Sequence, residues 1–259
     1  MRNKITILGV YGTKSQKGGS TAFLLNKNSV IDAGNLLLPL GEKSIDIEAV
    51  WLTHSHLDHI SDIAFIIDNY FEKRTKPLKI YALAETLEIV QKHFFNNKIW
   101  PDFSKIPLLN GKGMTILYHP LTFGEEYMLD DNSMIEAIAT DHTVPSCGYS
   151  LSKNGTGIVI TSDTYTLDAV IKYLNSHPNI SALVVECSFP SSMKELAIKS
   201  KHLTSEYLFD ALSTLIRKDI AIYINHMKPQ YEDQIREEIE KIKGSWNVTI
   251  LKDGDDIFF

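Results

Sequence analysis

The sequence predicts a layered domain that combines β-strands with α-helices, in the α+β class. The chain has 259 residues, a length at which one domain can bury a large core. Short β-rich runs alternate with segments whose apolar residues recur at helical spacing. No repeat of fixed period and no low-complexity linker interrupts the chain. We therefore expect residues 1–259 to form a single domain.

The expected strands are short runs rich in β-branched and aromatic residues, bounded by turn-forming residues. In order they are Lys4–Val10, Thr21–Leu25, Ser29–Asp32, Glu48–Thr53, Lys79–Ala82, Thr115–His119, Met134–Thr140, Gly157–Thr161, Ala182–Glu186, Ala221–Ile224 and Val248–Leu251. Near the end, Asp253-Gly254 predicts a tight turn before residues 257–259. This turn favours a terminal hairpin.

Helices are predicted most clearly in three segments. They are Ile60 to about Lys73, a segment with Thr204 as its N-cap, and Tyr231–Lys243, which ends at Gly244. Their apolar stripes should face the core. The stripes are Ile63, Ile66, Ile67 and Tyr70; Leu208, Ala211, Leu212, Leu215 and Ile216; and Ile235, Ile239 and Ile242. Residues 92–113 are the least regular, and a lid, a substrate-facing insertion and a plain surface loop are all open interpretations.

Composition narrows the classes of function. The formal charge of −6 argues against a nucleic-acid partner bound by a broad basic face. It leaves room for a small anionic substrate, because bound divalent ions reverse the sign of the charge inside a pocket.

Cys147 and Cys187 are too few for a disulfide framework or a thiolate metal site. The N-terminal apolar run Ile5–Val10 is too short for a signal peptide, and no stretch is long enough to span a membrane. A cytoplasmic location is expected.

The most informative segment is Thr53-His54-Ser55-His56-Leu57-Asp58-His59, between an apolar strand and the first predicted helix. In an extended stretch, residues two apart face the same way, so His54 and His56 can bind one ion. The turn into the helix directs Asp58 and His59 toward a neighbouring position. Imidazoles and carboxylates suit zinc-like metals. Three histidines and an aspartate within six positions are hard to explain by packing alone. We therefore expect a metal site here.

Three further candidate ligands each follow the end of a predicted strand, namely His142, Asp163 and His226. Ligands at successive strand ends would converge on one edge of a layered β structure. The predicted site holds two divalent ions, zinc being expected and manganese or iron the alternatives. The assignment gives His54, His56 and His142 to one ion, Asp58, His59 and His226 to the other, and Asp163 to both. His93, His119 and His177 have no such placement and are expected to be structural.

This ligand pattern resembles that of the metallo-β-lactamase superfamily. The resemblance implies a four-layer αββα sandwich, in which two mixed β-sheets pack face to face between helices. Within the superfamily, the chain looks most like the class II cyclic-nucleotide phosphodiesterases, from about Leu8 to Pro229. The segments that carry this likeness are His56-Leu57-Asp58-His59-Ile60, Gly19-Ser20-Thr21-Ala22, Val144-Pro145-Ser146, Glu186-Cys187-Ser188-Phe189-Pro190, His202-Leu203-Thr204 and Asn225-His226-Met227-Lys228-Pro229.

The resemblance implies a two-metal hydrolase whose partner is a small anionic phosphodiester. The expected reaction converts a 3',5'-cyclic nucleotide, cAMP or cGMP, to the 5'-nucleotide. A metal pair lowers the pKa of water enough to supply a nucleophile near neutral pH, and Asp58 could orient it. His202 is the candidate acid that protonates the departing ribose oxygen. Glu186 would orient His202.

Other functions remain open at this point. Ribonuclease Z-like tRNA 3'-processing is the nearest alternative, although the sequence has neither a long Gly/Pro-rich arm nor a net positive charge. Hydrolysis of another small phosphodiester or a sulfate ester would use the same metals. A di-iron redox protein and a non-catalytic metal-binding module are less compatible with the ligand set. The sequence leaves open the preferred nucleotide, the native metal and the oligomeric state, a homodimer being one option.

Overall fold

The computed structural model describes residues 3–259, so Met1 and Arg2 of the expected N-terminus lie outside the described residues. Two 7-stranded sheets form its centre. In the first, the strands run in the order β14 (Asp256–Phe258), β1 (Lys4–Gly9), β2 (Ala22–Leu24), β3 (Ser29–Ile31), β4 (Ala49–Trp51), β5 (Leu78–Leu83) and β6 (Ile116–Leu121). Strands β14 to β3 pair antiparallel and β3 to β6 pair parallel, so this sheet is mixed.

The second sheet mirrors this arrangement. Its order is β13 (Val248–Ile250), β12 (Ala221–Asn225), β11 (Ile180–Glu186), β10 (Thr156–Ile160), β9 (Cys147–Lys153), β8 (Met134–Ala139) and β7 (Glu126–Met128). Strands β13 to β10 pair parallel and β10 to β7 pair antiparallel. A parallel strand pair needs a crossover connection, and helices supply it in both sheets.

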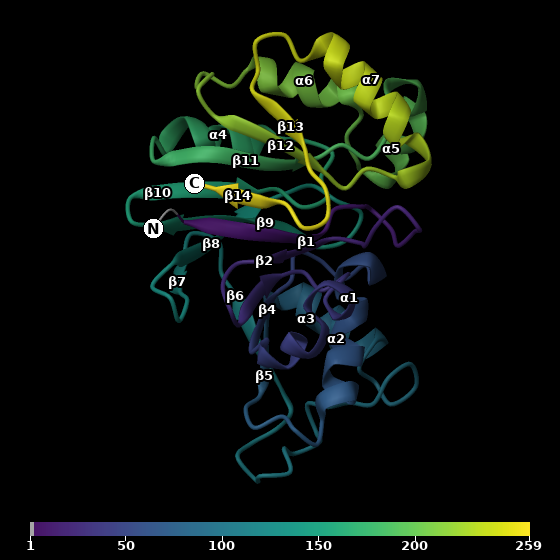
Figure 1. The fold of residues 1–259 in the computed structure, drawn as a ribbon, viewed down its shortest axis with the longest axis vertical. Coiled ribbons are helices and arrows are strands. Elements are labelled where there is room, and N and C mark those ends of the chain that lie inside the picture. The colour runs from purple at the N-terminus through teal and green to yellow at the C-terminus, as the bar shows by residue number, and fades with distance from the viewer. Residues whose placement is uncertain (1–2) are drawn as a thin grey trace.

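Helices cover the outer face of each sheet, so the predicted four-layer sandwich is confirmed (Figure 1). The first helical layer contains α1 (Leu37–Leu40), α2 (Leu57–Tyr70) and α3 (Ala84–His93), with the 3-10 turn η1 (Gly41–Asp46). The second contains α4 (Asp168–Ser176), α5 (Lys194–Ser200), α6 (Ser205–Ser213) and α7 (Glu232–Ile242), with the 3-10 turns η2 (Ser191–Met193) and η3 (Pro229–Tyr231). None of the helices within residues 3–259 is long and apolar enough to cross a membrane.

Three buried apolar clusters hold the layers together. One lies between the sheets and includes Phe23, Trp51 and Tyr149. A second packs the first sheet against its helices, and there Ile63, Ile66 and Ile67 are fully buried as the helical stripe predicted. A third packs the second sheet against its helices through the stripes of α6 and α7. Burial of a large aliphatic or aromatic side chain contributes about 1.5–3 kcal/mol.

Several predicted elements differ in detail. The helix expected from Ile60 begins at Leu57, which places Asp58 and His59 in its first turn. Helix α6 ends at Ser213, before the last two residues of its predicted stripe. Of these two, Leu215 is buried, whereas Ile216 is 79% exposed. Ile242, at the end of α7, is 42% exposed and not part of the core. The N-cap prediction is confirmed, since the Thr204 side chain accepts a hydrogen bond from the Tyr207 amide.

The predicted terminal hairpin is wrong. Strand β13 belongs to the second sheet, whereas β14 pairs with β1 at the edge of the first sheet. The turn at Asp253-Gly254 therefore carries the chain from one sheet to the other. The Asp253 carboxylate fixes this crossing by accepting hydrogen bonds from the Val10 and Gly19 amides. Residues near the two ends of the described chain therefore lie side by side, with Lys4 opposite Phe258 (Figure 1).

The irregular segment 92–113 has neither a strand nor a helix after His93. It is not loosely attached, because Phe95, Phe103 and Leu108 are buried. Phe95 and Phe103 belong to the cluster between the first sheet and its helices, and Trp100 packs at 5.5 Å against Phe65 of α2. The segment therefore forms a packed extension of the first helical layer. Neither a lid nor a plain surface loop describes it fully.

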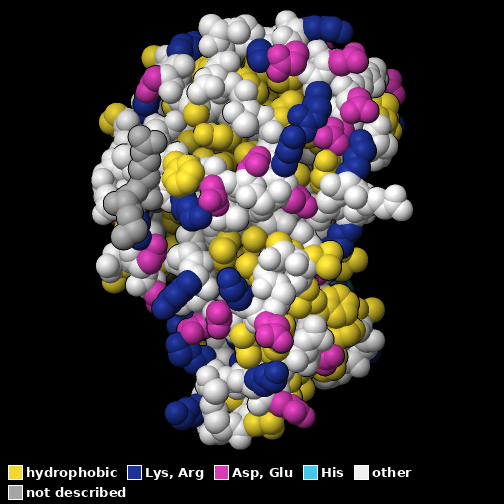
Figure 2. Space-filling view, viewed as in Figure 1, with side chains coloured by type: hydrophobic (Ala, Val, Ile, Leu, Met, Phe, Trp, Pro, Cys, Tyr) yellow, Lys and Arg dark blue, Asp and Glu magenta, His cyan; other side chains and the backbone are white. Residues whose placement is uncertain are grey.

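The charged side chains on the face shown in Figure 2 are interspersed over both halves of the molecule. Basic and acidic groups alternate there, and no broad basic area appears on that face. This mixture agrees with the formal charge of −6.

Candidate metal centre

The strand ends of both sheets meet at one place in the sandwich. In the first sheet, β4 is followed by His54 and His56, and the first turn of α2 adds Asp58 and His59. In the second sheet, β8, β10 and β12 are followed by His142, Asp163 and His226. The structure brings together all of the residues predicted as ligands, and their ligand atoms form groups within 4.8 Å.

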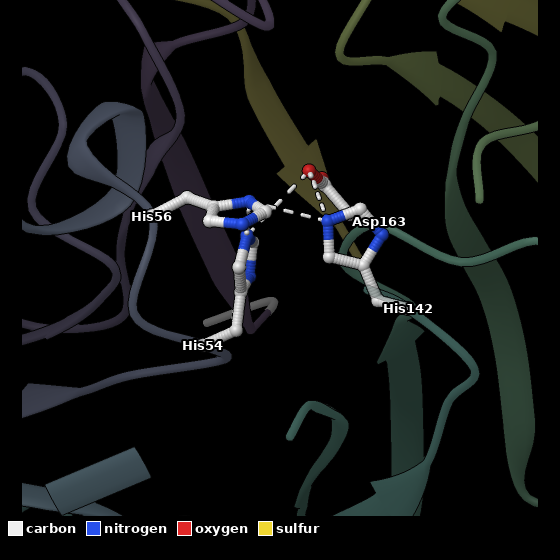
Figure 3. A group of neighbouring side chains, drawn as sticks. All are labelled: His54, His56, His142 and Asp163. Atoms are coloured by element: carbon white, nitrogen blue, oxygen red, sulfur yellow. Dashed lines mark hydrogen bonds and ion pairs between the residues drawn. The ribbon is translucent and has the colours of Figure 1, made fainter. Parts of the chain in front are cut away.

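The first group comprises His54, His56, His142 and Asp163, which point toward one another from opposite sides (Figure 3). Nδ1 of His56 lies 3.1 Å from Nε2 of His54 and 3.2 Å from Nε2 of His142. Oδ2 of Asp163 lies 3.7 Å from His54 Nε2 and 3.8 Å from His142 Nε2. His54 and His56 thus face the same point, as their spacing in an extended stretch predicts.

The second group comprises Asp58, His59 and His226. Nε2 of His59 lies 3.2 Å from Nε2 of His226, and Oδ2 of Asp58 lies 3.5 Å from His226 Nε2. Asp163 also borders this group, since its Oδ1 is 3.1 Å from His226 Nε2 and its Oδ2 is 3.5 Å from His59 Nε2. One carboxylate thus faces both groups, as a bridging ligand would.

In four of these histidines, Nδ1, the ring nitrogen that faces away from the cluster, forms a hydrogen bond. Nδ1 of His59 donates to Asp32 Oδ2 at 2.7 Å, and Nδ1 of His142 donates to the Lys201 carbonyl at 3.0 Å. The Thr53 hydroxyl donates to Asp32 and so accepts from His54 Nδ1. In the same way, the Ser188 hydroxyl donates to Glu186 and accepts from His226 Nδ1. These bonds put a proton on Nδ1, so Nε2 is the ring nitrogen that each of these histidines directs toward the cluster.

Burial keeps several of these imidazoles neutral, the form that binds metal. It lowers the pKa of His56 to about 4 and also lowers the pKa of His54 and of His142. For His59, burial acts to lower the pKa, but the carboxylates of Asp163 and Asp32 outweigh it and raise the pKa. His59 therefore lies among negatively charged groups. Such surroundings attract a cation.

The backbone near these ligands adopts rare conformations. Asp32, Ser162 and His226 all have positive φ, at 55°, 65° and 59°. A left-handed conformation costs a residue other than glycine about 1–3 kcal/mol and is concentrated at functional sites. At His226 and just before Asp163, this conformation directs a ligand toward the cluster.

The candidate acid, His202, lies at the edge of the second group. One of its ring nitrogens falls within 4.8 Å of ligand atoms of Asp163 and His226. Its Nδ1 donates to Glu186 Oε1 at 2.8 Å, and both side chains are buried. Glu186 also accepts from the Ser188 hydroxyl, which contacts His226. The pairing of His202 with Glu186 that the sequence suggested is thus present in the structure.

The other histidines lie apart from the cluster. His119 stacks on Tyr81 and His177 stacks on Tyr173, while His93 is exposed at the end of α3. Both cysteines are free and buried, and neither belongs to a group of potential metal ligands within residues 3–259.

Sequence reasoning missed Asp32. Its carboxylate is fully buried and accepts three hydrogen bonds, from the Thr53 amide, the Thr53 hydroxyl and His59 Nδ1. It therefore holds the motif that contains His54 and His59 in position. The available signal was its place at the end of a predicted strand, the same signal that identified His142 and Asp163.

Replacement of Asp32 with asparagine is expected to weaken metal binding by roughly 10–100-fold, as for other outer partners of metal ligands. Asparagine tolerates positive φ, so the backbone can be kept while the acceptor for His59 is changed. Competition against a chelator measures the affinity. Asp102→Asn, a buried aspartate in the 92–113 segment, is the matched control. Equal affinities in Asp32→Asn and wild type would contradict the role given to Asp32.

The donor set fits a pair of divalent ions. It provides five imidazoles and two carboxylates, the ligands that zinc, manganese and iron accept. In addition, Oδ1 of Asp163 is buried and accepts no hydrogen bond from any described residue. A buried carboxylate oxygen without a donor is costly unless a cation neutralises it. The cluster is therefore built for cations, although their number and identity stay predictions.

Comparison with known proteins gives this geometry a context. A family model of the class-II cAMP phosphodiesterases matches residues 20–139. The 3',5'-cyclic-nucleotide phosphodiesterase 1 of Saccharomyces cerevisiae is 32% identical over 93 residues, which cover 34% of this chain. A probable 3',5'-cyclic-nucleotide phosphodiesterase of Yersinia pestis is 22% identical over 220 residues, or 72% of this chain. The matches span 25% of the yeast relative and 58% of the Yersinia relative. Proteins named ribonuclease Z, from wheat and an archaeon, also match.

Solved structures decide the fold. Yeast PDE1 superposes with a TM-score of 0.82 at 20% identity, covering 100% of both chains. YhfI of Bacillus subtilis, described as a metallo-β-lactamase fold protein, superposes with a TM-score of 0.77 at 19% identity, covering 98% of both. The chain has the metallo-β-lactamase fold. The expected fold is therefore confirmed, and the family model adds a similarity to the class-II phosphodiesterases over residues 20–139. Within this fold, the cluster described above occupies the meeting point of the strand ends.

Proposed function

We propose that this protein is a metal-dependent phosphodiesterase that hydrolyses a 3',5'-cyclic nucleotide to the 5'-nucleotide. The observation that carries the proposal is the buried His202–Glu186 pair, placed beside a cluster of metal-binding side chains. The relationship to class-II phosphodiesterases supports the same reaction class. His54, His56 and His142 would hold one ion, Asp58, His59 and His226 the other, and Asp163 both.

Hydrolysis consumes one water. The water oxygen bonds to phosphorus, the bond from phosphorus to O3' breaks, and O3' leaves as a hydroxyl after taking a proton. When bound, a pair of divalent ions lowers the pKa of water and offsets the charge of the phosphate. The chain's own contribution is to supply the proton and to orient the groups around it.

His202 is the residue best placed to supply that proton. Glu186 fixes its Nδ1, so the other ring nitrogen is the one available to the substrate. Burial acts to lower the pKa of His202, but Glu186 outweighs burial and raises the pKa. Asp58, with a quarter of its side chain exposed, is placed to orient the attacking water. A positioned acid of this kind contributes about 10²–10⁴-fold to the rate.

The proposal is tested by adding zinc or manganese to metal-free protein and measuring hydrolysis of cAMP and cGMP. We expect 5'-nucleotide to form only in metal-replete samples, and a chelator to abolish its formation. The metal-loaded protein is also offered bis(p-nitrophenyl) phosphate. Absence of hydrolysis of all three substrates at full metal occupancy would reject the proposal.

A tRNA 3'-processing endonuclease is the second candidate, because ribonuclease Z proteins also match the chain. The same protein preparation should therefore be given a tRNA precursor. Cleavage of the precursor without turnover of either cyclic nucleotide would favour this second function.

A further inference from the structure

The rim of the candidate metal centre carries a lysine that the proposed chemistry does not use. Lys228 is partly buried and lies between β12 and the turn Pro229–Tyr231, two residues after His226. Its amide donates to the Ser188 carbonyl, so the backbone of Lys228 is tied to the same loop that supports His202 and His226. The backbone of Lys228 is therefore held close to both histidines.

Gly12 brings the Lys228 ammonium close to His226. The Nζ atom donates to the Gly12 carbonyl at 2.6 Å. A Cβ atom on Gly12 would lie 2.8 Å from this Nζ and 2.7 Å from Cε1 of His226. Any side chain at position 12 would fill the gap between the two groups. The glycine thus permits a cation and a candidate metal ligand to approach the same point.

The Lys228 charge lacks a counter-ion among residues 3–259. No carboxylate there lies within 4.0 Å of its Nζ, whereas neighbouring lysines are paired. Lys14 pairs with Asp62 at 2.6 Å, Lys17 with Glu232 at 3.2 Å and Lys201 with Asp141 at 2.6 Å. An ammonium has three donors, and the Gly12 carbonyl takes one. Two donors and a whole positive charge remain available close to the His226 ring.

The same charge reaches the candidate acid. Burial and the Lys228 charge both act to lower the pKa of His202, and Glu186 outweighs them. Ser188 also links the two residues, because its carbonyl accepts from the Lys228 amide and its hydroxyl contacts His202 Nδ1.

We propose that Lys228 is a substrate-binding residue that contacts an unesterified, negatively charged oxygen of the phosphodiester. It makes the site selective for anionic esters over neutral ones. This inference rests on the proposed function for the identity of the substrate. The contact itself, an ammonium with a phosphate oxygen, needs only an anion of that chemistry.

Two variants separate the charge from the packing of this side chain. Lys228→Gln keeps a donor for the Gly12 carbonyl but removes the charge, and Lys228→Arg keeps the charge. Lys17→Gln is the matched control, because Lys17 donates to the carbonyl of Pro229, the residue after Lys228, but is paired with Glu232. Metal content and thermal melting are measured first for all proteins, so that only variants with wild-type occupancy are compared.

The decisive measurement is the binding of inorganic phosphate to the metal-loaded proteins by calorimetry. Loss of a hydrogen-bonded charge should raise the phosphate Kd about 10-fold or more in Lys228→Gln. Lys228→Arg and Lys17→Gln should stay within about 3-fold of wild type. An unchanged Kd in Lys228→Gln overturns the inference.

Turnover separates this inference from the proposed function. With cAMP, Lys228→Gln should raise KM about 10-fold and change kcat less, because the contact forms with the bound substrate as well as with the transition state. If wild type hydrolyses no phosphodiester but binds phosphate more tightly than Lys228→Gln, the proposed function fails and the anion contact stands. If wild type turns over cAMP and Lys228→Gln matches it in KM and phosphate Kd, the anion contact fails alone.

Discussion

Replacement of Asp163 with alanine should remove bound metal and activity together. Its carboxylate faces both sets of ligands, with oxygens 3.1–3.8 Å from four different imidazoles. Without it, His54 and His142 lose the carboxylate that they share with His59 and His226. Metal assistance supplies several kcal/mol of transition-state stabilisation, and each 1.4 kcal/mol is tenfold in rate. We therefore expect phosphodiesterase activity to fall by roughly 10³-fold or more.

Elemental analysis and cyclic-nucleotide hydrolysis on the same sample measure both effects. Asp219→Ala is a suitable control, because Asp219 is an exposed partner of Arg217 on the surface. The control should retain metal and activity. Full metal occupancy in Asp163→Ala would show that the carboxylate does not bridge the two positions.

Replacement of His202 with alanine should have the opposite pattern: metal retained and turnover lost. His202 stands beside the ligands and is held by Glu186. Its loss removes the proton donor while leaving every assigned ligand in place. We expect kcat for cAMP to fall about 10²–10⁴-fold, with a smaller change in KM.

His177→Ala serves as the control, since His177 stacks on Tyr173 away from the cluster. Glu186→Gln adds a graded case, because it retains His202 but weakens the charge that positions it. Its kcat should lie between those of wild type and His202→Ala. A wild-type kcat in His202→Ala with full metal content would remove His202 from the mechanism.

The sequence predicted the cluster well because its chemistry is local and periodic. In the segment His54 to His59, residue spacing alone indicates which side chains face a common point. The rule that ligands follow strand ends then led to His142, Asp163 and His226, and the structure brings these three next to the first segment. Their metal-binding roles stay predictions until metal content is measured.

The sequence was less informative where long-range contacts decide the structure. Strand β9 was missed because its small and polar residues, such as Gly148 and Ser150, lack a clear strand pattern, although both are buried between neighbouring strands. The pairing of β14 with β1 joins residues at opposite ends of the chain. Asp32 was overlooked because its partners, Thr53 and His59, are distant in sequence. Such contacts leave no periodic signal.

The candidate ligands follow strands of both sheets, and this origin has a thermodynamic consequence. An ion held by His54 and His142 at once would cross-link the two halves of the sandwich without a covalent bond. Binding to the native state alone at a thousand times the Kd adds about 4 kcal/mol of stability, a large part of the margin of a typical domain. The fraction of folded protein in a cell would then depend on the concentration of free metal. When that metal is scarce, more of the chain would be unfolded and open to proteolysis, even at an unchanged rate of synthesis.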